Sequence, residues 1–146
     1  MATKATLQVT IDCADPASLA PFWAEALGYE LQGPPDGFDS WPTALAAWGV
    51  PESEWNSASA IVDPAGSGPR VFFHRVPEAK VGKNRVHLDV GASDGPGIPV
   101  ERKRSQVLPA VERLVGLGAR VLRKVEEMDS FWVVLADPEG NEFCVT

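Results

Sequence analysis

Several features are scarce in this chain of 146 residues, and each scarcity excludes a class of protein. The only two cysteines, Cys13 and Cys144, are too few for a disulfide-stabilised scaffold. No apolar run reaches the length of ~18 residues that a membrane-spanning helix needs. The first residues, MATKATLQVTID, lack the charged and then apolar segments of a secretory signal peptide, so we expect a cytoplasmic protein.

Positive charge is also in short supply. The chain has 13 basic and 20 acidic residues and a formal net charge of −7, which argues against a nucleic-acid partner. Hydrophobic residues make up 45% of the chain and charged residues 23%, an ordinary composition for a single globular domain. Five tryptophans stand against one tyrosine, and 13 glycines with 13 prolines indicate many turns.

The chain contains an internal repeat. Residues 8–15 (QVTIDCAD) and 87–94 (HLDVGASD) have the same length and the same alternating pattern, 79 positions apart. A helical pattern follows each of them and ends at a Leu-Gly pair, at Gly28 and at Gly118, where left-handed caps are expected. The second copy is longer by residues 95–105 (GPGIPVERKRS), which we interpret as a loop rich in glycine and proline.

One amphipathic helix is predicted in each copy. The first has an apolar stripe at Leu19, Phe22, Trp23 and Ala26. Asp15 is its expected cap, but Pro21 would clash with the preceding turn, which favours a regular start at Ser18. The second has its stripe at Val107, Leu108, Val111, Leu114 and Val115. Its expected cap is Ser105, which puts Pro109 at the fourth position, where no donor is needed.

Three strands are expected after each helix. They cover Tyr29–Leu31, Ser59–Val62 and Arg70–Val76 in the first copy, and Ala119–Val125, Phe131–Ala136 and Glu142–Val145 in the second. Turns rich in proline and glycine, residues 63–68 and 137–140, separate the last two strands of each copy. Residues 33–57 form an insertion in the first copy, with a short helix expected around Trp41 and Trp48.

Each copy therefore consists of a strand, a helix and three strands, and this pattern resembles the vicinal oxygen chelate superfamily. That superfamily contains glyoxalase I, bleomycin-resistance proteins and extradiol dioxygenases, and the chain is most similar to glyoxalase-like proteins of actinobacteria. The stretches that carry the resemblance are residues 12–16 (DCADP), 22–28, 69–78, 83–89 (KNRVHLD), 118–119 and 137–144 (DPEGNEFC). Such a resemblance determines the fold far better than the function.

The resemblance implies an α+β fold in a single domain of residues 1–146. Two βαβββ modules, residues 5–77 and 84–146, would form an open, partly barrelled mixed sheet with the helices outside. It also implies a homodimer.

The resemblance further implies a divalent ion, with one ligand on the first strand and one on the last strand of each module. The matching first-strand residues are Gln8 and His87. The matching position on the last strand of the second module is Cys144, where a glutamate is expected, with Glu142 two residues earlier. In the first module, residues 71–75 offer no carboxylate, and His74 is the only possible donor. We therefore expect no cofactor; the alternative is zinc, nickel, manganese or iron bound by Gln8, His87 and Glu142.

His87 and Asp89 are two residues apart on a strand and share one face, so they are the candidate catalytic pair. A neutral histidine beside a carboxylate can act as a general base. The alternative is that Asp89 only orients His87 or pairs with Arg85.

The candidate ligand-binding residues are mostly aromatic: Gln8, Trp41, Trp48, Trp55, Phe72, Trp132 and Cys144. Aromatic rings in a cleft stack on flat ligands, although the tryptophans of the insertion could equally anchor it to the sheet edge. The main hypothesis is a protein that binds a small aromatic or apolar molecule, with neither nucleic acid nor membrane as partner. The alternatives are a metal-dependent lyase, isomerase or dioxygenase, and a metal-free enzyme that uses His87 or Asp89.

Overall fold

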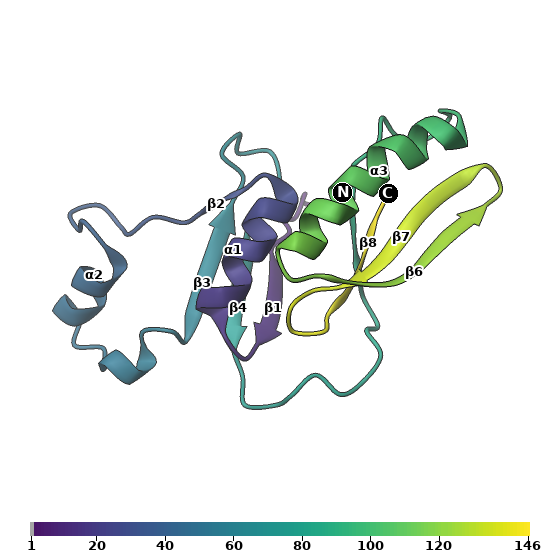
Figure 1. Ribbon diagram of the computed structural model, residues 1–146. Helices are drawn as coiled ribbons and strands as arrows, with labels where there is room; N and C mark the ends of the chain where they lie inside the picture. The colour runs from purple at the N-terminus through teal and green to yellow at the C-terminus, as the bar shows by residue number, and fades with distance from the viewer. Residues whose placement is uncertain (1) are drawn as a thin grey trace. The chain divides into compact units, whose positions relative to one another are not determined.

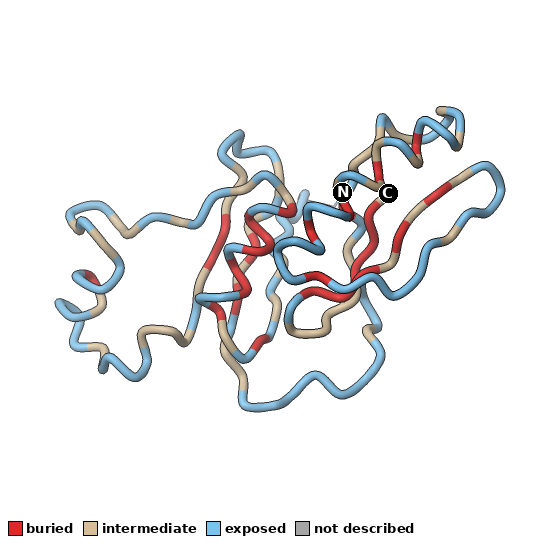
Figure 2. The backbone as a smooth tube through the Cα atoms, in the orientation of Figure 1, coloured by how far each residue is buried: buried red, intermediate tan, exposed pale blue. Residues whose placement is uncertain are grey.

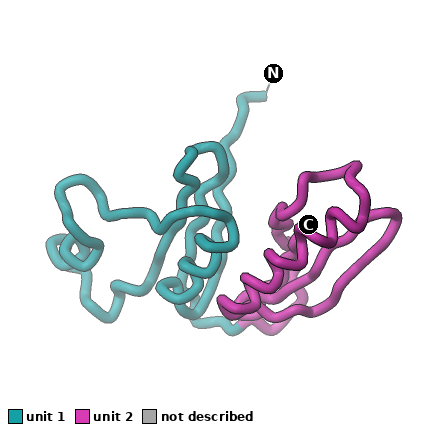
Figure 3. The backbone as a smooth tube through the Cα atoms, turned by 45° about the horizontal axis from the view of Figure 1, so that its top comes forward, with its two compact units in different colours: residues 1–79 teal, residues 80–146 magenta. Residues whose placement is uncertain are grey.

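The chain folds into two compact units with the same topology (Figure 1). The computed structural model describes residues 2–146. The boundary between the two units lies between Ala79 and Lys80 (Figure 3). Each unit contains one of the two predicted modules. Among the described residues, no helix combines the length and the apolar character needed to cross a membrane.

The first unit is a four-stranded sheet with one long helix against it. Its elements are β1 (Val9–Cys13), α1 (Pro16–Leu27), β2 (Glu30–Leu31), β3 (Ala58–Val62) and β4 (Val71–Arg75). The strand order is β1-β4-β3-β2, in which β1 and β4 are parallel and the other pairs are antiparallel. The first strand of the module therefore pairs with its last strand.

The second unit repeats this arrangement. Its elements are β5 (Leu88–Val90), α3 (Val100–Gly116), β6 (Arg120–Glu127), β7 (Ser130–Ala136) and β8 (Glu142–Val145). The strand order is β5-β8-β7-β6, again with the first and last strands parallel. The predicted α+β class and the two βαβββ modules are confirmed. The strands form two four-stranded mixed sheets, neither of which closes into a barrel.

Asp15 caps the N-terminus of helix α1. The Asp15 carboxylate accepts a hydrogen bond from the backbone N–H of Ser18 at 3.3 Å, and Pro16 occupies the first turn. The helix therefore starts at Pro16, before the expected Ser18, and accommodates Pro21 inside it. It ends at Gly28, whose φ of 68° is the left-handed conformation that glycine adopts without strain.

The core of each unit lies between its helix and its sheet (Figure 2). All four residues of the predicted α1 stripe are buried: Leu19, Phe22, Trp23 and Ala26. In the second unit, α3 packs on β6, β7 and β8. Alternate strand residues supply the other half of that core: Phe131, Val133, Leu135, Phe143 and Val145.

The start of α3 differs from the expectation. The helix begins at Val100, so part of the expected loop at 95–105 is helical and Ser105 is not the cap. Glutamate, arginine and lysine at 101–104 are good helix formers, and they extend the helix back to Pro99. The Ser105 hydroxyl instead donates a hydrogen bond to the Arg102 carbonyl at 2.7 Å, and Pro109 lies in the helix interior.

The insertion between β2 and β3 forms an arm, residues 33–57, that extends to one side of the first sheet (Figure 1). It carries the predicted short helix, α2 (Trp41–Ala47), and a 3-10 turn, η1 (Glu52–Glu54). The indole N–H of Trp41 donates to the Gln32 carbonyl at 2.8 Å, and that of Trp55 donates to the Val50 carbonyl at 3.0 Å. These two tryptophans therefore bond to backbone carbonyls at the base of the arm and within it.

Candidate functional site

An open pocket of about 740 Å³ lies on the face of the second sheet opposite α3. Since side chains alternate along a strand, the residues of β7 and β8 that do not face α3 face this pocket. It is lined by Lys83, His87, Asp89, Leu122, Arg123, Trp132, Val134, Glu142, Cys144 and Thr146. Five of the candidate residues, His87, Asp89, Trp132, Glu142 and Cys144, are thus brought to one place.

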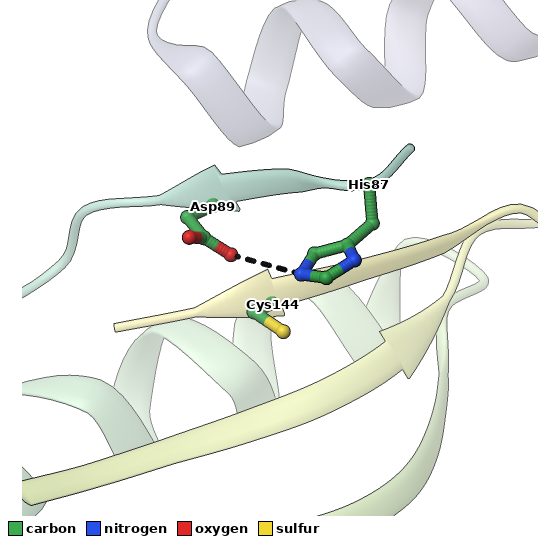
Figure 4. Close-up of side chains that lie close together, drawn as sticks. All are labelled: His87, Asp89 and Cys144. Carbon is green, nitrogen blue, oxygen red and sulfur yellow. Dashed lines mark ion pairs between the residues drawn. The ribbon is translucent and has the colours of Figure 1, made fainter. Parts of the chain in front are cut away.

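At the centre of the pocket, two strands place three reactive side chains together. Asp89 on β5 lies directly opposite Cys144 on β8 in the parallel register, and His87 immediately precedes β5. The candidate ligand atoms of His87, Asp89 and Cys144 all lie within 4.8 Å of one another (Figure 4). The His87 Nε2 atom is 3.5 Å from the Asp89 Oδ1 atom.

Burial and neighbouring charges shift the pKa values of two groups in the pocket, the Cys144 thiol and the Glu142 carboxyl. Burial raises the pKa of the Cys144 thiol, and the Asp89 carboxylate raises it further through its charge and by accepting the thiol hydrogen bond. On the same strand, the ion pair and hydrogen bond from Lys83 lower the pKa of the Glu142 carboxyl. Cys144 is therefore a protonated thiol, and Glu142 is a carboxylate already engaged with a cation.

The His87–Asp89 pair has the arrangement of an oriented base. Asp89 lies beside His87, whereas Arg85, the alternative partner, forms no ion pair with Asp89 in the part of the chain that the structure describes. Both side chains are about half exposed, at 49% and 62%, so a ligand in the pocket can reach them. A carboxylate in this position orients the imidazole.

A second group of candidate residues gathers in the first unit around Arg70. The Arg70 Nε donates to the Gln32 side-chain oxygen at 2.7 Å, and its Nη1 donates to the Gln8 side-chain oxygen at 3.0 Å. The guanidinium carbon lies 5.3 Å from the centre of the Phe72 ring. Trp41 joins the group through its bond to the Gln32 carbonyl.

Sequence reasoning did not single out Arg70 or Gln32. The predicted strand Arg70–Val76 does put Arg70 and Phe72 on one face, since they are two residues apart. That spacing is the only signal for Arg70, and nothing in the sequence indicates Gln32. Of the remaining candidates, Trp48 packs edge-on against Phe38 at 5.6 Å within the arm, and Trp55 bonds to Val50.

The register also identifies the residues at the ligand positions implied by the resemblance. In the first unit Thr10 lies opposite Phe72, and in the second unit Asp89 lies opposite Cys144. Thr10 and Asp89 are 79 residues apart, which is also the separation between Gln8 and His87 in the repeat. Phe72 and Cys144 are therefore equivalent, and neither offers a carboxylate. His74 lies farther along β4, with its Nδ1 atom 3.6 Å from the Asp12 carboxylate.

These residues do not fit a hard divalent cation, which prefers oxygen ligands. Phe72 has no donor atom, and the Gln8 oxygen is already bound to the positively charged Arg70. The His87, Asp89 and Cys144 cluster suits a borderline ion such as zinc better, because imidazole and thiolate are both zinc ligands.

Several solved structures share this fold. A hypothetical protein from S. aureus is 13% identical, with a TM-score of 0.64, and the match covers 99% of this chain and 94% of that chain. A glyoxalase/bleomycin resistance protein/dioxygenase family enzyme from Burkholderia phytofirmans PsJN is 14% identical, with a TM-score of 0.62 and 94% of each chain covered. At these identities the structures show the fold and not the activity.

The fosfomycin resistance protein FosX from Listeria monocytogenes has the same fold. A mutant of that protein, in complex with Mn(II) and 1S,2S-dihydroxypropylphosphonic acid, is 11% identical with a TM-score of 0.59, and the match covers 99% of this chain and 90% of that chain. No curated protein matches the chain. The sequence pattern of the glyoxalase-like domain matches residues 8–146, and the chain therefore belongs to the glyoxalase-like domain family.

Proposed function

We propose that this chain binds a small organic molecule with a flat apolar part in the pocket of its second unit. The observation that carries the proposal is the composition of that pocket: the apolar side chains of Leu122, Trp132 and Val134 lie in it together with polar and charged side chains. An apolar surface beside polar groups that fix orientation suits a small organic ligand.

Each side of the pocket has a distinct role in this binding. Trp132, Leu122 and Val134 supply the apolar wall, and the indole of Trp132 offers a flat surface for stacking. His87, Asp89 and Arg123 supply the polar groups that orient the ligand. Lys83 contributes less, because Glu142 already neutralises it.

Nuclear magnetic resonance of the ¹⁵N-labelled chain tests the proposal, with 2-naphthol as an uncharged aromatic probe. We expect saturable shifts of the Trp132 indole N–H and of the backbone amides of His87, Asp89 and Cys144. A Trp132→Phe substitution should weaken the binding severalfold, because it reduces the stacking surface. The matched control is Trp41→Phe, which lies in the first unit and should leave these shifts intact.

Two results would contradict this proposal. One is the absence of any saturable shift at Trp132, and the other is a set of shifts confined to the tryptophans of the arm. The second result would instead support ligand binding by Trp41, Trp48 and Trp55.

The cluster of His87, Asp89 and Cys144 favours a second candidate function, metal-dependent catalysis in the same pocket. A zinc ion bound there would polarise a substrate oxygen or activate a bound water. His87, Asp89 and Cys144 would hold the ion, and Trp132 would position the apolar part of the substrate.

Metal content distinguishes the two functions. The purified chain is incubated with zinc, manganese, nickel or iron(II), dialysed and analysed for bound metal. One zinc ion per chain, lost in both His87→Ala and Cys144→Ala, would establish the second candidate. Absence of a stoichiometric ion under all four conditions, together with 2-naphthol binding, would support the first. A third reading, metal-free catalysis, requires that His87→Ala abolish turnover of a bound substrate without abolishing its binding.

A further inference from the structure

We propose that Arg70, Gln8 and Gln32 form a site in the first unit for the anionic group of a small molecule, a carboxylate or a phosphate. The site consists only of residues of that unit, so it stands independently of the pocket around His87. It rests on three observations, namely the missing counter-ion of Arg70, the unused N–H donors of the cluster and the fixed position of the guanidinium.

Arg70 has no acidic partner. Among residues 2–146, no carboxylate lies within 4.0 Å of its guanidinium, although the chain has seven more acidic than basic residues. Arg75, at the end of β4, pairs with Glu54 at 3.0 Å, and Arg102 pairs with Asp94 at 2.6 Å. Arg70 instead bonds to two neutral amide oxygens, which leave its positive charge uncompensated.

The cluster offers donors and few acceptors. A guanidinium has five N–H donors and no acceptor, so Gln8 and Gln32 must both present their oxygen atoms to Arg70. The amide NH₂ group of each glutamine then points elsewhere, and neither has a hydrogen-bond acceptor within the described residues 2–146. All three side chains therefore keep N–H donors that no described residue accepts.

The guanidinium is held in place before any ligand binds. Phe72 lies against its face, and the two glutamine oxygens fix its edge. Gln32 is itself fixed, because its backbone N–H donates to the Ala60 carbonyl at 2.9 Å and its carbonyl accepts from Trp41. A fixed arginine loses little side-chain entropy when an anion binds, which makes its hydrogen bonds more effective.

The chemistry of the ligand follows from the guanidinium. Its planar fork matches the two oxygens of a carboxylate or of a phosphate in a bidentate pair. On the same sheet, the nearest acidic residue of β1 is Asp12, which lies beside His74 farther along the strands. We therefore expect an anionic group to bind at Arg70 without direct competition from Asp12.

The test uses the ¹⁵N-labelled full chain and two simple anions, inorganic phosphate and acetate, titrated at constant ionic strength. We expect saturable shifts of the Arg70 Nε–H signal and of the Gln8 and Gln32 side-chain NH₂ signals. The anion with the lower dissociation constant identifies the ligand class. Arg70→Gln should weaken binding at least tenfold, while the matched control Arg75→Gln, five residues farther along the chain and already paired with Glu54, should not.

A second variant guards against a loss of binding that merely reflects misfolding. Gln8→Glu keeps Arg70 and supplies an internal carboxylate, so it should abolish anion binding while the backbone spectrum of β1 and β4 stays unchanged. The proposal is overturned if Arg70→Gln and Arg75→Gln bind anions equally, if Gln8→Glu binds like the parent chain, or if neither anion gives a saturable shift.

Discussion

The cap of α1 depends on two residues that are far apart in sequence. Asp15 accepts from the Ser18 hydroxyl at 2.7 Å and from the Asn56 side-chain amide at 2.8 Å, while the Asn56 oxygen accepts from the Ala17 backbone N–H at 2.9 Å. These bonds, with that of Asn56 the largest influence, lower the pKa of the Asp15 carboxyl below its ordinary value of 3.8.

The cap should weaken in acid. Because the folded-state pKa of Asp15 is lowered, its contribution to stability is present above pH 3.8 and is lost as the pH falls through the folded-state value. Replacing the cap by alanine, Asp15→Ala, should lower the free energy of unfolding by about 1 kcal/mol near neutral pH, and by less in strong acid. Urea unfolding at both pH values measures the difference. Asp15→Asn is the control, since its cap does not titrate, and an Asp15→Ala effect that is the same at both pH values would contradict the prediction.

Individual site residues could be predicted from the sequence only where the side chains that meet in the site lie on paired strands of one module. His87 and Asp89 were singled out by their spacing on one strand, Glu142 and Cys144 by the ligand positions that the resemblance implies, and all four line one pocket. Arg70 was not identified, because its partners Gln32 and Gln8 are 38 and 62 positions away, and no local pattern connects them. A side-chain hydrogen bond across a fold leaves no spacing signal in the sequence.

Among the elements, α3 contains a proline in its interior. Pro109 has no N–H to donate to the Ser105 carbonyl, and its ring crowds that carbonyl. The prediction of the α3 start was wrong because it placed Pro109 in the first turn, where proline costs nothing. The helix tolerates Pro109 because Val107, Val111 and Leu114 are buried against the sheet.

Replacing this proline should stabilise the second unit. Pro109 is exposed, so Pro109→Ala restores a backbone hydrogen bond without disturbing the core. Removing an interior proline should add ~3 kcal/mol of helix stability, less the ~1 kcal/mol by which proline restricts the unfolded chain. We expect a net gain of about 2 kcal/mol in the free energy of unfolding. Urea denaturation checks this, and an unchanged or lower midpoint would show that the turn around Pro109 is not strained.

Helix α2 of the arm is not among the elements that pack closely on the first sheet. The bond from Trp41 to Gln32 ties α2 to the end of β2. Trp41→Phe preserves the apolar ring but removes the donor, so we expect faster proteolysis within residues 33–57 at nearly unchanged global stability. Trp48→Phe is the matched control, since its ring contact with Phe38 does not depend on a donor. Equal proteolysis of the two variants would contradict the prediction.

The sequence predicted most elements because each has a strong local pattern. The bounds of β8 were predicted as they are found, since a turn rich in proline and glycine delimits the strand. Strand β2 is shorter than expected, with only Glu30 and Leu31 paired to β3. Its length depends on long-range pairing and not on its own residues, which is why the sequence overestimates it.

At the scale of the whole molecule, the two units are joined by a stretch without regular structure between β4 and β5. Val81 and Val86 in this stretch are 94% and 78% exposed. Trypsin should therefore cut first after Lys80 or Arg85, and mass spectrometry of a brief digest should find two large fragments that end near these residues. An early cut within α3 or β6, which also contain lysine and arginine, would contradict the division into two units.

The matched registers of the two sheets make the side chains of the sites interchangeable. Gln8, Thr10 and Phe72 occupy the places in the first sheet that His87, Asp89 and Cys144 occupy in the second. None of the three first-sheet residues is fully buried, so exchanging them changes the chemistry of the first half without removing a fully buried core side chain. Three substitutions in the first half, Gln8→His, Thr10→Asp and Phe72→Cys, would place the same histidine, aspartate and cysteine group there.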